Sequence, residues 1–345
     1  MNTFREPAQE HRPLLDNSGK NTLETKITEA PVKPLLVLPI MIAACSGDRS
    51  DSGSDTASGR GCGDGNSLVT GQGSRLAAVS VGQGNACTLD SSGQISCWGD
   101  GGEDVPNEAP DRGCYTHISS GGGWGWYDFA CALHADNTID CWGFEEGAVD
   151  PPEGRFTAIS AGGAHACALD EGGQIDCWGN EEHHASAIAA PAGTFESISS
   201  GWENTCAIDL DGRLSCWGDD RFGLVSDTPS GRFVDVSVNG LHACAISYGR
   251  ATCWGGPQED LIDDAPLDGT AVATTGDLGL SCTRTMDGAV TCRTSGWQAE
   301  PDLSAPEGTF THFDAGLYTL CAFGEEADTL QCWGSDQWGL IGGAP

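Results

Sequence analysis

The sequence predicts an all-β protein assembled from seven copies of one short unit, each with about three strands. Three observations support this prediction: a segment repeats along the chain, the cysteines come in closely spaced pairs, and the composition is rich in glycine. The chain has 50 glycines in 345 residues, and only 19 % of its residues are charged. Such a composition is typical of turn-rich β proteins rather than helical ones.

The repeated unit is clearest in residues 159–179 and 198–218. Both segments begin with Ile-Ser and end in Cys-Trp-Gly. Between these ends, both contain Cys-Ala followed two residues later by Asp. Seven cysteine pairs mark the units: Cys87 and Cys97, Cys131 and Cys141, Cys167 and Cys177, Cys206 and Cys216, Cys244 and Cys253, Cys282 and Cys292, and Cys321 and Cys332. A repeat near 40 residues is the mark of a solenoid or a ring of blades.

Each cysteine pair is expected to clamp a hairpin. In the third unit the alternating segments 167–169 and 174–177 flank an Asp-Glu-Gly-Gly turn. A disulfide across such a short loop stabilises the unit by about 2–3 kcal/mol. A preceding run such as 158–161 adds a third strand. Because three strands cannot bury both faces alone, we expect residues 75–345 to close into a seven-bladed β-propeller with one hairpin disulfide per blade.

The unit also resembles a known family. Its pattern [Ile/Val]-Ser-x-Gly-x-x-His-x-Cys-Ala-[Leu/Ile]-Asp, followed by Cys-Trp-Gly, is similar to the regulator of chromosome condensation (RCC1) repeat in its short bacterial form. The resemblance implies a binding propeller. WD40 is the alternative fold, but Trp-Gly rather than Trp-Asp ends the strand. Blade six departs most from the pattern, because Arg293 replaces the tryptophan. The sequence does not decide whether residues 335–345 complete blade one.

Charge limits the partners. The chain has 16 basic and 50 acidic residues, a net charge of −34, and no lysine after residue 44. Such a surface repels phosphate backbones, so we expect no nucleic-acid binding, and the chromatin role of eukaryotic relatives is not transferred. Carboxylates gather in the loops after Trp-Gly, which favours a cationic partner. Weak calcium binding and a merely solubilising surface are the alternatives, and no other cofactor or metal is expected.

The N-terminus indicates export. Residues 35–44 form an apolar run between Lys33 and Cys45, too short to span a bilayer but suited to a signal peptide. Ala43-Ala44-Cys45 resembles the bacterial lipobox, which implies lipidation of Cys45. We therefore expect a signal segment at 1–44, with 1–31 untranslated if synthesis starts at position 32, and a tether at 45–74. The predicted location is the bacterial cell envelope, as an outer-membrane or surface lipoprotein that touches the membrane only through its lipid.

The remaining cysteines agree with an oxidising compartment. No CxxC or CxxH cluster occurs, so metal binding is not favoured. Once the seven pairs and Cys45 are assigned, Cys62 and Cys114 remain and are predicted to pair.

Blade two carries the most distinctive binding candidates. Its first hairpin follows a glycine-rich segment with Trp124, Trp126 and Tyr127, and Trp202 of blade four is a further candidate. Glycines with exposed aromatic side chains make an adaptable contact surface. The alternative is that these rings only fill a gap between blades. The tryptophans of Cys-Trp-Gly are expected to pack between blades, and His165 and His242 to be hydrogen-bonded structural residues.

These features predict a surface-exposed, monomeric lipoprotein that acts as a non-catalytic binding module for a protein or a glycan through one propeller face. No catalytic motif is present. The alternatives are an extracytoplasmic carbohydrate-active enzyme, a hydrolase or lyase that uses carboxylates on the propeller face, and a purely structural envelope protein.

Overall fold

The computed structural model describes residues 76–100, 105, 108–110, 113–122, 128–144, 149–180, 187–256, 269, 271–274, 280–294, 305–316, 319–324, 329–336 and 339–345, which all belong to the compact unit Ile42–Pro345. They form seven three-stranded sheets, as predicted. The strands are β1 (Leu76–Val81), β2 (Ala86–Asp90), β3 (Ile95–Trp98), β4 (Tyr115–Gly121), β5 (Phe129–His134), β6 (Ile139–Gly143), β7 (Phe156–Ala161), β8 (His165–Asp170), β9 (Ile175–Gly179), β10 (Phe195–Ser200), β11 (Asn204–Asp209), β12 (Leu214–Gly218), β13 (Asp235–Val238), β14 (His242–Ser247), β15 (Arg250–Gly255), β16 (Ala271–Thr274), β17 (Leu280–Arg284), β18 (Val290–Thr294), β19 (Phe310–Ala315), β20 (Thr319–Gly324) and β21 (Leu330–Gly334).

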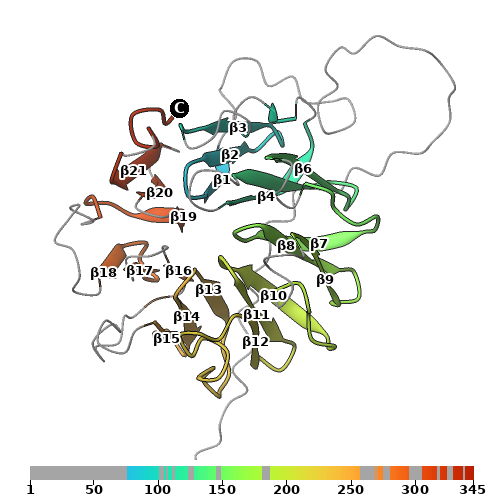
Figure 1. Ribbon diagram of the computed structural model, residues 1–345. Helices are drawn as coiled ribbons and strands as arrows, with labels where there is room; N and C mark the ends of the chain where they lie inside the picture. The colour runs from blue at the N-terminus through green and yellow to red at the C-terminus, as the bar shows by residue number, and fades with distance from the viewer. Residues whose placement is uncertain are drawn as a thin grey trace, which may run out of the picture. The chain divides into compact units, whose positions relative to one another are not determined.

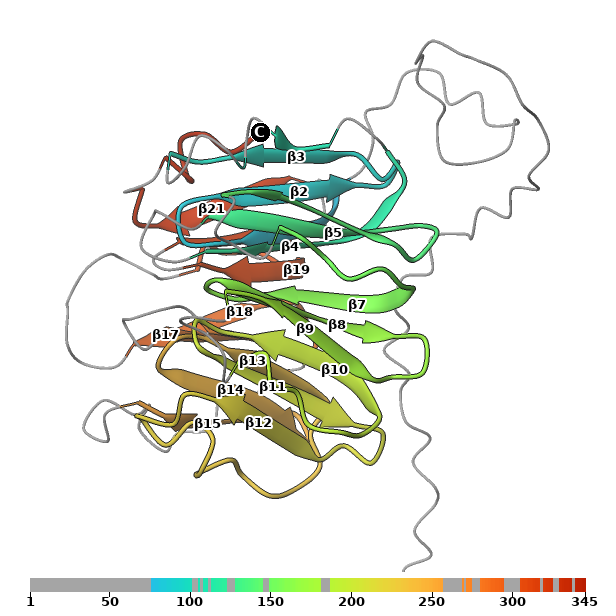
Figure 2. The same ribbon diagram turned by 45° about the vertical axis from the view of Figure 1, so that its right-hand side comes forward.

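The sheets follow one another around a closed ring. Each is an antiparallel meander of three consecutive strands, and its first strand contacts the first strands of the sheets before and after it, including β19 against β1. Figure 1 shows the seven blades in chain order, and Figure 2 shows the same ring turned by 45°. The ring form of the prediction is thereby confirmed, and it solves the edge problem because no blade stands alone.

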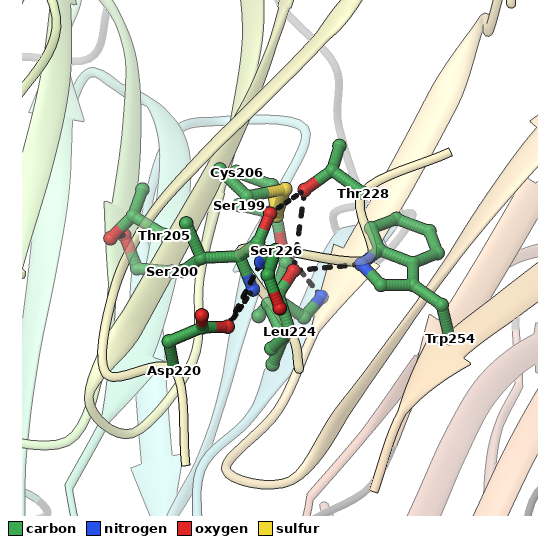
Figure 3. Close-up of a disulfide and its surroundings, with 12 residues drawn as sticks. Ser199, Ser200, Thr205, Cys206, Asp220, Leu224, Ser226, Thr228 and Trp254 are labelled. Atoms are coloured by element: carbon green, nitrogen blue, oxygen red, sulfur yellow. Dashed lines mark hydrogen bonds between the residues drawn. A yellow bond between two sulfur atoms is a disulfide. The ribbon is translucent and has the colours of Figure 1, made fainter. Parts of the chain in front are cut away.

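All seven predicted hairpin disulfides are present. In every blade the two cysteines lie directly opposite each other in the register of the second and third strands, as Cys206 and Cys216 do in blade four. The bridged sulfurs lie close to the hydrophobic clusters between blades (Figure 3). Each cross-link therefore closes within one blade, and neighbouring blades are held together by packing and hydrogen bonds.

The cores lie between neighbouring blades. One cluster joins Phe129 and Leu133 of blade two to Phe156 and Ala166 of blade three. The tryptophans of Cys-Trp-Gly contribute to such clusters, since Trp98, Trp142, Trp217, Trp254 and Trp333 are buried, while Trp178 is half-buried. The packing role predicted for these residues is confirmed. Apolar burial of this kind is the main stabilising contribution to the ring.

A serine in the first strand of blades one to four links each of these blades to the next one. Ser160 Oγ of blade three accepts a hydrogen bond from the amide of Ser200 in blade four, at 2.8 Å. The same bond recurs at other seams, as from the Val238 amide to Ser199 Oγ. This role explains why Ser follows Ile or Val in the repeated pattern.

The C-terminal tail settles how the ring closes. The described residues of this tail, 335–336 and 339–345, add no strand to blade one. Instead Leu340 is buried against Trp98, whose indole nitrogen donates to the Leu340 carbonyl at 2.8 Å. In the loop between blades four and five, the Leu224 carbonyl likewise accepts a hydrogen bond from the indole nitrogen of Trp254, also at 2.8 Å (Figure 3).

The turn inside the tail copies that loop as well. Asp336 accepts the amide of Ile341 at 2.7 Å, just as Asp220 accepts those of Val225 and Ser226. The tail is therefore an additional copy of the inter-blade loop, and it seals the ring at the place where chain continuity is missing.

Candidate functional site: the central mouth

The ends of the first strands meet around a central opening that we call the mouth. It is lined by residues from six blades and leads into a cavity of about 90 Å³. The lining is mostly glycine and small side chains, with Gln83, Trp202 and Asn239 as the larger polar or aromatic exceptions. A larger side chain placed there would therefore change the shape of the opening.

Glycine is required at the mouth because the blades approach each other closely. A Cβ on Gly121 would lie 2.5 Å from the Gly162 carbonyl oxygen of the next blade, and a Cβ on Gly162 would lie 2.3 Å from that of Gly201. The same contact recurs between Gly316 and Gly82, at 2.0 Å. These distances are shorter than side chains tolerate, so the glycine of the repeated Ser-x-Gly pattern serves close approach rather than a special backbone angle.

Trp202, one of the predicted binding residues, lies at the rim of the mouth. It is half-buried and stacks on the backbone of blade three, where a Cβ on Gly163 would meet its ring at 2.0 Å. A rigid aromatic side chain at the edge of a cavity is a typical anchor for a ligand. Trp202 is thus positioned where the binding hypothesis needs it.

The aromatic segment of blade two begins and ends beside the same mouth. Trp124, Trp126 and Tyr127 lie outside the described residues. Of the two flanks, Gly122 lines the mouth and Asp128 packs directly against Gly122. Both described flanks of the segment therefore lie at the same opening as Trp202.

Asp128 itself was not singled out by sequence. Its side chain is 3 % exposed, and neither carboxyl oxygen has a hydrogen-bond partner among the described residues. Burial raises the pKa of Asp128 to about 6, against a smaller opposing effect of the neighbouring Asn85. Burial disfavours the charged carboxylate more than the Asn85 amide stabilises it, and this balance explains the direction of the shift.

Asp314 is a second carboxyl that sequence inspection missed. It replaces the linking serine in blade seven and accepts the amides of Val81 and Ala315, each at 2.8 Å. Burial raises its pKa to about 6, and the backbone amides oppose that shift. Aligning the repeats residue by residue would have revealed Asp314, because every other described first strand except that of blade six has Ser at this position.

The two repeat histidines have structural hydrogen bonds, as predicted. His165 Nε2 lies 2.9 Å from Thr205 Oγ1 of the next blade, and His242 Nε2 lies 2.8 Å from Ser281 Oγ. Both rings are buried, and desolvation lowers the pKa of His242 to about 4. A hydroxyl on the following blade accompanies each histidine, so the residues form pairs across the seams.

The acidic loops are partly engaged in building structure. The pKa of Asp220 is lowered, first by the Ser226 amide and also by that of Val225. Asp219 and Glu203 both pair with Arg221. In the described part of the chain no group of three or more His, Cys, Asp or Glu side chains is arranged to hold a metal ion.

Several predictions concern residues outside the described ranges: the signal segment and tether, Cys45 and Cys62. Cys114 is disulfide-bonded. Within the described ranges no helix is both long and apolar enough to cross a membrane. The seven disulfides indicate an oxidising environment.

Comparison with known protein families finds a match for two of the repeats. Residues 156–184 and 195–224, which include blades three and four, match the family described as Regulator of chromosome condensation (RCC1) repeat. The chain resembles the RCC1-repeat propellers. No curated protein sequence matches this RCC1-like propeller.

Two solved structures share the fold. The entire ectodomain of the receptor kinase CR4 from Physcomitrella patens is 25 % identical, with a TM-score of 0.61 over 76 % of this chain and 74 % of that one. The CRINKLY WD40 ectodomain of the Arabidopsis thaliana receptor kinase ACR4 is 24 % identical, with a TM-score of 0.58 over 76 % of this chain and 98 % of that one. RCC1-like propellers are typically binding or regulatory modules.

Proposed function

We propose that this RCC1-like propeller is an exported recognition protein, tethered by a lipid on Cys45, that binds an extracellular protein or glycan at the mouth. Fold alone does not assign a ligand, so the proposal depends on the site. The observation that carries it is the convergence of Trp202 and both flanks of the blade-two aromatic segment on one cavity rim.

The chemistry of the mouth fits such a role. Its floor is backbone and small side chains, which leaves room for a protruding group of the ligand. The aromatic side chains supply contact area at low entropic cost. The net charge of −34 favours a cationic ligand, whose binding weakens as salt screens the attraction.

Binding is tested with a glycan array and a displayed library of secreted protein domains, using the whole exported protein. Trp202→Ala and the combined Trp124→Ala, Trp126→Ala, Tyr127→Ala variant should each weaken the strongest interaction about ten-fold or more. Phe222→Ala is the matched control, because Phe222 is an exposed aromatic residue that does not line the mouth. Equal affinity of all four proteins would refute the mouth as the binding site.

Two further measurements separate the other parts of the proposal. Mass spectrometry of the protein from a diderm bacterium should find acyl chains on Cys45, and none after Cys45→Ala. An intact segment 1–44 would refute export by this route. Glycans recovered after incubation should keep their mass, whereas cleaved products would favour the enzyme alternative.

A further inference from the structure

The exposed apolar residues of the propeller are not scattered. Five large apolar side chains are exposed in the described part of the chain, and four of them lie at the end of blades four to six where the hairpins turn. Leu210, Tyr248 and Met286 occupy the tips of three consecutive hairpins, with 67 %, 89 % and 87 % of their surfaces exposed. Val234, at 65 %, lies at the start of blade five.

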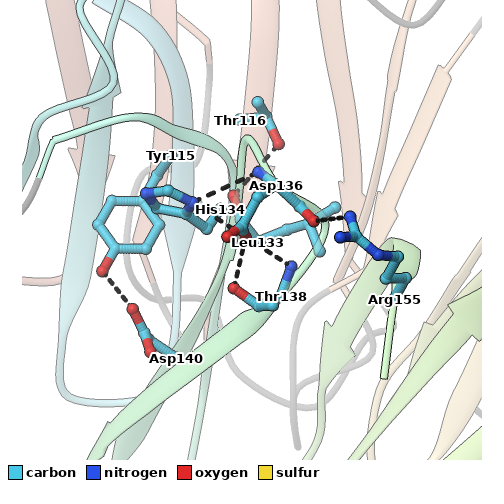
Figure 4. A network of polar contacts seen from close by, with 8 residues as sticks. All are labelled: Tyr115, Thr116, Leu133, His134, Asp136, Thr138, Asp140 and Arg155. Atoms are coloured by element: carbon cyan, nitrogen blue, oxygen red, sulfur yellow. Dashed lines mark hydrogen bonds and ion pairs between the residues drawn. The ribbon is translucent and has the colours of Figure 1, made fainter. Parts of the chain in front are cut away.

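The corresponding tips of blades one to three are different. Ser91, Ala135 and Glu171 occupy them, and none is a large apolar residue. In blade two the turn is closed by a polar network, in which Asp136 accepts the hydroxyl of Thr138 at 2.6 Å and Arg155 donates to the Asp136 carbonyl (Figure 4). The apolar tips are therefore a property of one arc of the ring, not of the repeat.

Hydrogen bonds between blades fix the tips of this arc relative to one another. The amide of Phe233, at the start of blade five, donates to the Gly212 carbonyl in the turn of blade four, at 2.7 Å. Ser247 Oγ in the turn of blade five donates to the Arg232 carbonyl at 2.7 Å, and the Gly269 amide at the start of blade six donates to Gly249. The turns of blades four and five are thus held against the segments that begin blades five and six.

Basic side chains lie among the apolar ones. Arg232 and Arg250 are exposed and have no ion-pair partner among the described residues, although the whole chain carries a net charge of −34. Other described arginines have polar partners: Arg213 pairs with Asp209 and Asp211, Arg221 with Glu203, and Arg155 donates to the Asp136 carbonyl. Among the described residues, Arg232 and Arg250 therefore place two positive charges without an ion-pair partner beside the four exposed apolar side chains.

We propose that this surface, the tip patch, docks a protein partner that presents apolar side chains surrounded by carboxylates. The tip patch consists of Leu210, Arg232, Val234, Tyr248, Arg250 and Met286. Tyr, Met and Arg are the residue types enriched in protein interfaces, and Lys and Glu, which the patch lacks, are depleted there. The carboxylates of the partner complement Arg232 and Arg250.

Charge also selects among possible occupants. Two copies of this chain, each at −34, repel each other, and an extended anionic lipid surface is repelled as well. A few carboxylates on a partner interact mainly with the nearby Arg232 and Arg250, because salt screens the more distant charges. The tip patch lies at the hairpin end of the blades, whereas the mouth lies at the other end of the same strands. The partner of the tip patch is therefore distinct from the ligand of the mouth, and the two proposals stand independently.

The test uses the intact protein and a displayed library of random peptides of about 15 residues. Selection runs against the wild type, with counter-selection against Leu210→Ser/Tyr248→Ser/Met286→Ser. We expect enriched peptides that combine Asp or Glu with aromatic or aliphatic residues. Their affinity should fall about ten-fold or more in Arg232→Glu/Arg250→Glu. Ala135→Ser/Glu171→Ser, which changes the tips of blades two and three, should bind as the wild type does.

Three outcomes would overturn the proposal. One is no enrichment over the counter-selected variant, or enrichment of neutral or basic peptides. The second is sedimentation of the wild type, but not of the triple variant, with vesicles of phosphatidylcholine and about 30 % phosphatidylglycerol, which makes the patch a lipid-binding surface. The third is a dimer in light scattering that the triple variant abolishes. Melting curves of all variants check that these exposed substitutions leave the fold intact.

Discussion

The seam between blades three and four and the seam between blades seven and one solve the same problem with different residues. At the first, Ser160 accepts the amide of the next blade, and the chain runs on without interruption. At the second, Asp314 accepts the amide of Val81, and the two blades belong to opposite ends of the propeller. The comparison shows that the ring closes through the same kind of hydrogen bond that joins the other blades.

The segment that covers the tryptophan in the third strand of each blade is also equivalent at the two seams. An inter-blade loop lies over the tryptophan of the following blade, as the Ala187 carbonyl does for Trp217 at 2.7 Å. At blade one the C-terminal tail takes that place, since the Leu340 carbonyl accepts the indole nitrogen of Trp98. The closing seam is therefore a regular seam made from the chain's two ends, with a carboxyl in place of a hydroxyl.

The strongest test of this equivalence compares Leu340→Ala with Leu224→Ala. Both side chains are 1 % exposed and lie over equivalent tryptophans, so each truncation should cost about 2–5 kcal/mol. Differential scanning calorimetry of the oxidised proteins should show both melting temperatures lowered by about 5 °C or more. If Leu224→Ala is costly while Leu340→Ala is neutral, the tail does not hold the ring closed.

The glycines of the mouth provide the next test. Gly162→Ala and Gly316→Ala place a Cβ 2.3 Å and 2.0 Å from a backbone oxygen of the neighbouring blade, and each should cost about 1–3 kcal/mol. Urea unfolding measures the loss. Gly172→Ala is the control, because its Cβ first meets a side-chain oxygen, that of Asp170 at 3.2 Å, rather than the backbone of a neighbouring blade. A neutral Gly316→Ala beside a costly Gly162→Ala would mean that the closing seam is the looser of the two.

A pH series isolates the carboxyl of the closing seam. The pKa of Asp314 is about 6 in the folded protein and lies above its unfolded value, because burial disfavours the charged form. Its contribution to stability is therefore complete below about pH 4 and is lost as the pH rises through 6. Relative to Asp314→Asn, the wild type should lose about 2 kcal/mol of stability between pH 4 and pH 7 in urea unfolding.

Asp209→Asn gives the opposite sign and serves as the control. The pKa of Asp209 is lowered, first by the amide of Arg213, so its contribution is present at neutral pH and is lost as the pH falls. Should Asp314→Asn leave the pH profile unchanged, water reaches this carboxyl and the closing seam is less tightly packed than described.

The smallest expected effect concerns the serine link itself. Ser160→Ala removes the acceptor of the Ser200 amide and should cost about 1 kcal/mol. Ser197→Ala is a matched control in the adjacent strand, because the hydroxyl of Ser197 is buried without a hydrogen-bond partner among the described residues. Urea unfolding should find the control neutral or slightly stabilised. Equal losses in both variants would show that the link adds nothing beyond packing.

The blades were predictable because their signals are local and repeated. Cysteine spacing specifies each hairpin, and an Asp-x-x-Gly turn marks those of blades one, three and four. The structure confirms the turn in blade three, where Asp170 Oδ1 accepts the amides of Gly172 and Gln174, at 2.8 Å each. The packing of the Cys-Trp-Gly tryptophans also followed from repetition. Seven copies of one pattern leave little freedom for an alternative fold.

What escaped prediction depends on which side chains from different blades meet. Asp128 becomes a buried carboxyl only because Gly122 and Asn85 enclose it, and no sequence spacing expresses that. The role of the tail was left open because a strand and a loop were equally compatible with residues 335–345. The tip patch was accessible in principle: Leu210, Tyr248 and Met286 occupy one repeat position, but its exposure becomes evident only when the direction of each turn is known.

The uninterrupted order of strands within every blade has a consequence for the gene. Since no blade borrows a strand from the far end of the chain, the starting point of the polypeptide is arbitrary. A circular permutant that joins Pro345 to Leu76 through a short linker, and opens in the loop between blades four and five, encodes the same ring with its free ends on the opposite side. Secretion signals, anchors or fused domains can then be attached at any blade without redesigning the core.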